Sequence, residues 1–227
     1  MTALEYGKDI IIIDAGLTFP SAEMPGIDLV VPDISYLVQN KDKIRGIVLT
    51  HGHEDHIGGL PYVLKDVNVP VYGTKLTLML CEHKLIEQRI NDYTLNCVKP
   101  SGIVKLGCFT VEFIHVNHSI PGSCALAIQT PVGMVFHSGD FKIDLTPING
   151  QMIDITRISE IGKKGVTLLL CESTNVEHEG YTMSENVVGE TLDRLFIEHA
   201  KRRIIVATFA TNVHRLQQII NLAHKNK

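Results

Sequence analysis

One short stretch, residues 50–59, constrains what this chain can fold into more than any other. It reads Thr-His-Gly-His-Glu-Asp-His-Ile-Gly-Gly and follows the apolar run 46–49, which has the composition of a buried strand. Four side chains of types that bind metals follow that strand closely: His51, His53, Asp55 and His56. Imidazole nitrogens and carboxylate oxygens suit zinc, and a loop anchored by a strand can turn several of them toward one point. The alternative is a polar loop with chance histidines, a pattern expected in only about one chain in a thousand of this length and composition.

The order of these residues also bears on how many metals bind. The adjacent side chains of Asp55 and His56 diverge from the pair His51 and His53, so a single mononuclear site would not use all four. The sequence therefore predicts two neighbouring zinc ions.

Another candidate ligand lies in residues 103–141, a region of alternating strand patterns. The predicted strand 109–116 leads to His115 and His118, which are three positions apart and so face opposite sides of a continuing strand. A turn begins at Ser119, ends the strand and frees His118. We therefore expect His118 in the site and His115 packed against the protein interior.

Two aspartates follow other predicted strands at sharp bends. Asp14 ends the apolar run Ile10–Ile13, where a simple turn before a glycine is the alternative to a functional role. Asp140 follows Gly139 after the predicted strand 133–137, and strand parity separates it from His137. We expect Asp140 to be the residue that turns toward the metals.

An acidic residue also follows the predicted strand 166–171, where Glu172 opens the string Glu-Ser-Thr-Asn. By strand statistics alone, Glu172 would be an edge residue. The string from Thr182 to Glu185 has the form of a capping box and predicts the start of a helix.

A last predicted strand, 204–209, runs into a helix that ends near His224. Asn212 is the expected cap of that helix, which leaves free backbone N–H groups near His214 and Arg215. Such groups can bind phosphate, so these three residues are candidate RNA contacts. An ordinary cap followed by a solvated helix face is the alternative, and the sequence leaves it open.

Composition sets broad limits on the function. The chain has 227 residues, 44% of them hydrophobic, a formal net charge of −4 and five cysteines. Its apolar runs are too short to cross a bilayer, the N-terminus does not have the layout of a signal peptide, and the cysteines form no C-x-x-C pair. We therefore expect a cytoplasmic protein without a membrane partner, and the net charge does not single it out as a nucleic-acid binder.

The pattern H-x-H-x-D-H resembles the second motif of the metallo-β-lactamase superfamily. The strings Asn-His-Ser-Ile-Pro and His-Ser-Gly-Asp-Phe-Lys resemble its third and fourth motifs, and Glu-Ser-Thr-Asn resembles the start of the β-CASP module of its RNA-processing branch, to which bacterial ribonuclease J belongs. The resemblance implies an α/β fold, an αββα sandwich in residues 1–180 followed by the start of a β-CASP α/β module in 181–227.

The resemblance also implies a function. It implies a zinc-dependent ribonuclease that hydrolyses RNA phosphodiesters with a metal-bridging hydroxide. One zinc would be held by His51, His53 and His118, the other by Asp55 and His56, and Asp140 would bridge them. Candidate catalytic residues are Asp14, which would orient the histidine loop, and Glu172.

The same resemblance implies that further segments of the family lie outside this chain. Among them are the strand before residue 1, later histidine motifs that supply a proton donor and a last zinc ligand, and a C-terminal domain for homo-oligomers or paralogue hetero-oligomers. We accordingly expect the chain alone to be nearly inactive, and backbone groups of the sheet that contains Ile10–Ile13 to be left unpaired.

Three rival functions use the same features. A thioester or lactam hydrolase of this fold needs the same metals, a DNA nuclease needs the same chemistry, and a truncated chain could serve as an RNA-binding module without activity. Glu172 and the helix after it favour a nuclease.

Overall fold

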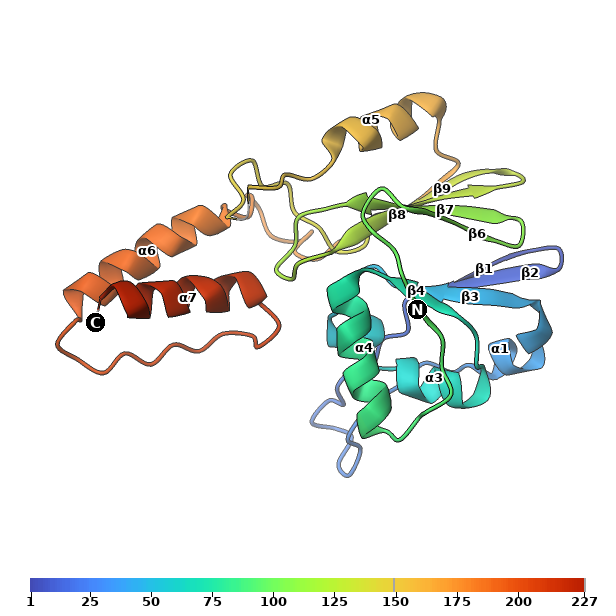
Figure 1. Ribbon diagram of the computed structural model, residues 1–227, viewed down its shortest axis with the longest axis horizontal. Coiled ribbons are helices and arrows are strands. Elements are labelled where there is room, and N and C mark those ends of the chain that lie inside the picture. Colours follow the sequence, from blue (N-terminus) through green and yellow to red (C-terminus); the bar gives the residue numbers. More distant parts are fainter. Residues whose placement is uncertain (149, 227) are drawn as a thin grey trace.

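Two sheets face each other in the computed structural model, which describes residues 1–148 and 150–226, and helices cover both outer faces (Figure 1). The first sheet has the order β1-β2-β3-β4-β5: β1 (Thr2–Tyr6), β2 (Asp9–Ile13), β3 (Ile44–Val48), β4 (Val71–Gly73) and β5 (Leu95–Cys97). The second has the order β10-β9-β8-β7-β6: β6 (Ile103–Leu106), β7 (Phe109–His115), β8 (Cys124–Thr130), β9 (Gly133–His137) and β10 (Leu168–Leu170). The predicted αββα sandwich is confirmed.

The alternation of side chains along β2 explains how the layers form. Ile10 and Ile12 pack against the helices, whereas Ile11 and Ile13 pack between the two sheets against residues such as Phe113. All four isoleucines are at most 1% exposed. Each such burial stabilises the fold by roughly 1.5–3 kcal/mol, so this strand anchors both layers at once.

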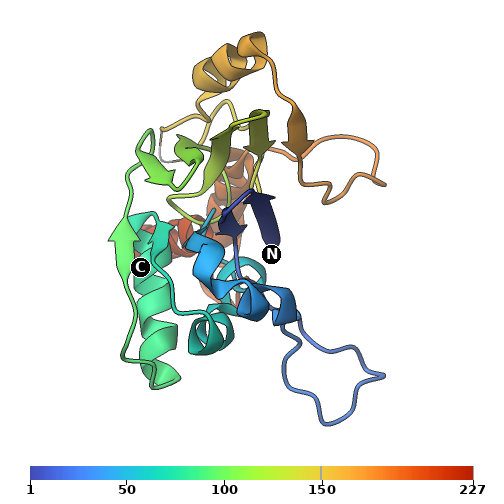
Figure 2. The same cartoon turned by 90° about the vertical axis from the view of Figure 1, so that its right-hand side faces the viewer.

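Helices occupy the two outer faces unequally. The first sheet carries α1 (Ser35–Gln39), the short 3-10 turn Lys41–Lys43, α2 (Glu54–Ile57), α3 (Leu60–Asp66) and α4 (Lys75–Glu87) on its side of the sandwich. The second sheet is covered by α5 (Ile155–Lys164), whose Ile161 packs against β7 and β8. Figure 2 shows α5 at one end of the stack and α4 toward the other, with the strands between them.

Within the described residues, the strand Ile10–Ile13 has a neighbouring strand on each side, and the edge of its sheet lies at β1. β1 pairs antiparallel with β2 along its whole length, from Thr2 opposite Ile13 to Tyr6 opposite Asp9. Gly7, with φ 61°, supplies the left-handed turn between them. The signal for β1 in the sequence is weak because none of its five residues is buried.

Two helices, α6 (Glu185–Glu198) and α7 (Val213–Lys225), form a hairpin beside the sandwich (Figure 1). The predicted strand 204–209 is wrong, since residues 203–209 lie in no strand. A strand needs a neighbour for its backbone groups, and within the described part of the chain this segment pairs with none. Ile205 and Phe209 are accordingly 86% and 84% exposed.

The caps of the two helices differ in how well they were predicted. The capping box at Thr182 is wrong, because α6 begins later and Ser184 caps it by accepting a hydrogen bond from the N–H of Asn186 at 3.3 Å. Asn212 caps α7 as predicted and accepts from the N–H of Arg215 at 3.2 Å. Across the ranges that the structure describes, no helix is long and apolar enough to cross a membrane.

Candidate metal centre

The loop after β3, which carries His51, His53 and His56, packs against the loop after β2. The two backbones lie so close that no side chain fits between them at the glycines. The backbone N–H of Ala15 donates to the carbonyl of His56 at 2.7 Å, which joins the segment after β2 to the segment after β3. A Cβ on Gly16 would lie 1.6 Å from the carbonyl oxygen of Asp55, and one on Gly59 would lie 2.4 Å from that of Gly16. Glycine at these positions lets the two loops meet.

Three imidazoles converge at the end of β3. His53 Nδ1 lies 3.1 Å from His51 Nε2 and 3.1 Å from His118 Nε2. His53 Nδ1 carries at most one proton, so it can donate a hydrogen bond to only one of these two nitrogens. At the other contact, the lone pairs of two nitrogens face each other. Three neutral imidazole nitrogens within 4.8 Å of one another fit a bound cation such as zinc.

The protonation of these imidazoles supports the same conclusion. His51 is completely buried; burial, followed by the charges of His56 and His118, lowers its pKa to about 2. Burial, followed by the charge of His53, lowers the pKa of His118 to about 4. Both rings are therefore neutral at pH 7, which is the form that ligates metals.

Asp140 lies between this trio and a second group of ligand atoms. Its Oδ2 is 4.0 Å from His51 Nε2 and 3.9 Å from His118 Nε2, while its Oδ1 is 3.4 Å from His56 Nε2. Asp55 Oδ2 approaches the same His56 nitrogen at 3.6 Å. Burial disfavours the charged form of Asp140, but the hydrogen bond from His56 and nearby histidine charges outweigh it and lower its pKa to about 2.

Asp14 supports the loop from beneath. Its carboxylate accepts from the Thr50 N–H at 2.7 Å and the Thr50 hydroxyl at 2.8 Å, and it contacts His56 Nδ1 at 2.8 Å. The Thr50 hydroxyl in turn contacts His51 Nδ1 at 3.0 Å. Burial opposes a charge on His56, yet its hydrogen bonds to Asp14 and Asp140 raise its pKa to about 10. Asp14 thus aims Nε2 of His56 toward Asp140.

In each of the two pairs of neighbouring candidates, only one residue lies in a group of possible ligand atoms. His115 Nε2 is buried and has no hydrogen-bond partner within residues 1–148 and 150–226, and His115 belongs to neither group of ligand atoms. His137 also lies outside both groups, and its Nδ1 accepts from the N–H of Gly139 at 3.1 Å. Gly139, with φ 57°, makes the bend that turns Asp140 inward.

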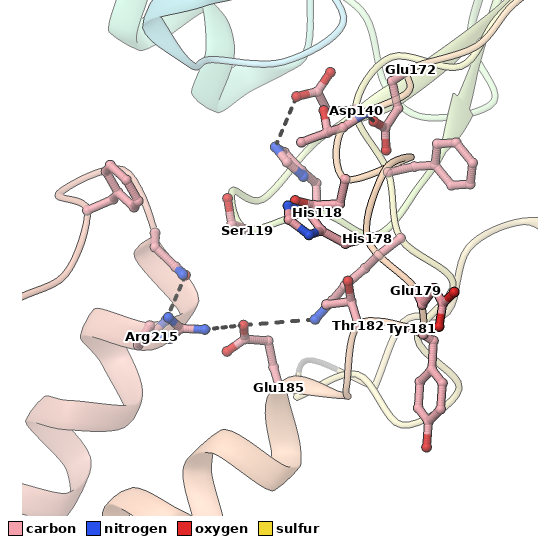
Figure 3. Close-up of a pocket in the computed structure, with 17 residues that line it drawn as sticks. His118, Ser119, Asp140, Glu172, His178, Glu179, Tyr181, Thr182, Glu185 and Arg215 are labelled. Carbon is pink, nitrogen blue, oxygen red and sulfur yellow. Dashed lines mark hydrogen bonds and ion pairs between the residues drawn. The ribbon is translucent and has the colours of Figure 1, made fainter.

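A cavity of about 770 Å³ opens beside His118 and Asp140 (Figure 3). Glu172 lines it and is half-buried, with its carboxylate accepting from the Thr174 N–H at 2.7 Å. Asn212 and Arg215 lie on the wall formed by the hairpin, whereas His214 lines a smaller cavity of about 130 Å³ next to it.

Part of the cavity wall is formed by residues that no sequence motif indicates for this role. Lys142 and Glu185 line it, as do Ser119 and the loop 174–182 with His178. Lys142 ends the string that resembles the fourth motif, and Glu185 ends the string that has the form of a capping box. Their proximity depends on how the hairpin meets the sandwich, which no local pattern encodes.

Comparison with known proteins agrees with this fold. Residues 1–146 match the model of the Metallo-beta-lactamase superfamily. The chain belongs to the metallo-β-lactamase superfamily. A solved structure, a protein of unknown function from Enterococcus faecalis V583, shares the fold with a TM-score of 0.67 and 21% identity, over 96% of this chain and 59% of that chain.

Two curated relatives are more similar in sequence. Ribonuclease J of Synechocystis sp. is 49% identical over 226 residues, which cover 98% of this chain and 35% of the relative. Ribonuclease J of Thermus thermophilus is 42% identical over 233 residues, which cover 99% of this chain and 40% of the relative. The chain thus spans 35% and 40% of the lengths of these two relatives.

Proposed function

We propose that this chain carries the metal centre of a zinc-dependent ribonuclease that hydrolyses RNA phosphodiesters in the cytoplasm. The observation that carries the proposal is the convergence of His51, His53 and His118 beside Asp140, at the mouth of a cavity of about 770 Å³. Identities of 49% and 42% to two proteins named ribonuclease J support RNA as the substrate.

We assign the ligands as two groups that share one carboxylate. His51, His53 and His118 would hold one zinc, Asp55 and His56 the other, and Asp140 would serve both. Two zinc ions bound there would act as Lewis acids and would lower the pKa of a bound water toward about 7. The neutral state of His51 and His118 and the anionic state of Asp140 suit this assignment.

The other residues of the site would orient these groups and the substrate. Asp14 fixes the ring of His56 through Nδ1, which turns Nε2 toward Asp140 and the proposed metals. Glu172 borders the cavity beside Asp140, where it can direct polar groups of the substrate.

The hairpin would contribute RNA contacts through Asn212, His214 and Arg215. Asn212 and Arg215 border the same cavity as His118. The Asn212 side chain already caps α7, however, and Arg215 is paired with Glu185. Contacts with phosphate at this helix start would therefore come mainly from the remaining guanidinium donors and from His214.

The test is metal-dependent cleavage by a full-length protein that contains this sequence. We expect about two zinc ions per chain after dialysis, cleavage of single-stranded RNA, loss of cleavage with a chelator and recovery with zinc. A DNA oligonucleotide of the same sequence, a thioester and a β-lactam serve as alternative substrates. Preference for any of these over RNA would contradict the proposal, as would RNA binding without cleavage.

A further inference from the structure

The polar contacts between the hairpin and the sandwich gather at one place. Among the described residues, they join the segment 142–146, just after Asp140, to Ser184 and Glu185 at the start of α6. The N–H of Glu185 donates to Asp144 Oδ2 at 3.2 Å, and Ser184 Oγ donates to the carbonyl of Thr146 at 2.9 Å. The hairpin is thus attached to the same segment of chain that bears Asp140.

Glu185 is the centre of this junction. Its Oε1 lies 3.8 Å from Lys142 Nζ and 2.5 Å from Arg215 Nη2, and its carbonyl accepts from Gln218 Nε2 at 3.2 Å. One carboxylate therefore connects the segment after Asp140 to both helices of the hairpin. In Figure 3, Glu185 and Arg215 lie on the opposite side of the cavity from Asp140 and Glu172.

Lys142 also reaches the other ligand-bearing loop. Its backbone N–H donates to the carbonyl of Asn117 at 2.8 Å, and Asn117 precedes His118. Lys142 is therefore anchored by its backbone to the two loops that bear Asp140 and His118. The junction thereby attaches the hairpin to a fixed part of the sandwich at the edge of the cavity.

The charges of the junction favour a mechanical role over anion binding. Lys142 and Arg215 contribute two positive charges, and Asp144 and Glu185 contribute two negative ones, so the cluster is neutral overall. A neutral cluster attracts a phosphate only weakly. Moreover, Glu185 Oε2 is buried without a hydrogen-bond partner in the part of the chain that the structure describes, a costly arrangement that stability alone does not explain.

We propose that Glu185 is a positioning residue that sets the hairpin against the metal centre and so fixes the path of RNA through the cavity. The inference rests on the proposed ribonuclease function, because it concerns substrate that spans both walls. RNA in the cavity must touch the hairpin on one side and His118 and Asp140 on the other. A small displacement of one wall relative to the other would misplace the RNA and lower the rate of cleavage.

The test compares a long and a short substrate in the full-length protein. Glu185→Gln should lower kcat/KM for an RNA oligonucleotide by about tenfold, while kcat/KM for bis(p-nitrophenyl) phosphate, which reaches only the metals, stays within about twofold. Glu190→Gln is the matched control, because Glu190 is exposed on the same helix and lies outside the cavity. Unchanged RNA cleavage in Glu185→Gln would overturn the inference, and so would an equal loss with both substrates.

Two further measurements separate positioning from a general defect. In the double variant Glu185→Gln with Lys142→Met, the losses in RNA cleavage should be non-additive, because both changes break the same contact; additive losses would contradict the inference. Hydrogen exchange should also accelerate in segments 142–146 and 184–187 of Glu185→Gln and not in α4. This readout does not depend on RNA, so unaltered exchange overturns the inference even if the protein proves not to be a ribonuclease.

Discussion

The two walls of the cavity are built in different ways. The wall with the proposed metal ligands stands on β2 and β3, and the four isoleucines of β2, at 10–13, are at most 1% exposed. In the hairpin wall, Phe196 is the one apolar side chain that is buried among the described residues after 180. Ile197 and Ile220 are 59% and 60% exposed. One wall is fixed by its own core, and the other is held in place by a few polar contacts near Glu185.

This difference teaches where the precision of the site comes from. The proposed metal ligands project from loops that are held by Asp14 and by close glycine contacts, so we expect their geometry to survive changes elsewhere. The hairpin can shift as a unit if its junction is broken. Changes in the first wall should therefore alter metal binding, and changes in the second should alter how a long substrate is placed.

The largest effect is expected from Asp140→Ala. Asp140 approaches His51, His56 and His118, so its loss removes a ligand from both proposed metals. A metal ligand contributes several kcal/mol to the transition state, which corresponds to a loss of about a thousandfold or more in kcat. Elemental analysis should show that most metal is lost at one site and bound more weakly at the other. Two tightly bound zinc ions in this variant would exclude the bridging role.

Replacement of His118 and of His115 by alanine should give opposite results. His118→Ala removes a ligand at the edge of the cavity, so it should abolish phosphodiester cleavage with little change in the free energy of unfolding. His115→Ala should spare cleavage and lower the free energy of unfolding by about 1–3 kcal/mol as a packing defect. Equal losses of activity in both variants would show that the two histidines were wrongly distinguished.

Asp14→Asn should have a smaller effect on the metals. Asparagine tolerates the left-handed backbone at position 14, where φ is 56°, so the loop should keep its shape. The amide cannot accept all three hydrogen bonds that the carboxylate accepts from Thr50 and His56. Zinc affinity should fall by about 10–100-fold. A competition titration with a chelator would measure it, with the exposed Asp66→Asn as control, and equal affinities in the two variants would contradict the role of Asp14.

The contrast between the walls also explains what the sequence could predict. The convergence of side chains around His51 was predictable because each proposed ligand follows a strand, and strand parity distinguishes neighbours such as His118 and His115. The bend at Gly139 was predictable because a glycine directly before Asp140 permits a left-handed turn. Both rules depend only on neighbouring residues in the sequence. The sandwich fold then brings the ends of these strands, and the side chains that follow them, close together.

The errors arose where structure depends on distant neighbours. Residues 204–209 have the composition of a strand, but no neighbouring strand pairs with them in the described ranges, so composition alone misled. β1 was missed for the reverse reason, since its half-exposed residues look unremarkable until β2 pairs with them. Glu185 and Lys142 meet only through the docking of the hairpin, which no pattern within either segment predicts.

The smallest expected effect belongs to Ile205→Ala, and it tests the comparison directly. Ile205 is 86% exposed, so the change removes almost no buried surface and should alter the free energy of unfolding by less than about 0.5 kcal/mol. The matched change Ile11→Ala empties a fully buried position between the sheets and should cost about 2–5 kcal/mol. Urea unfolding of both variants measures the difference. A cost for Ile205→Ala close to that for Ile11→Ala would mean that Ile205 is covered in solution, and the two walls would then be equally well supported by apolar packing.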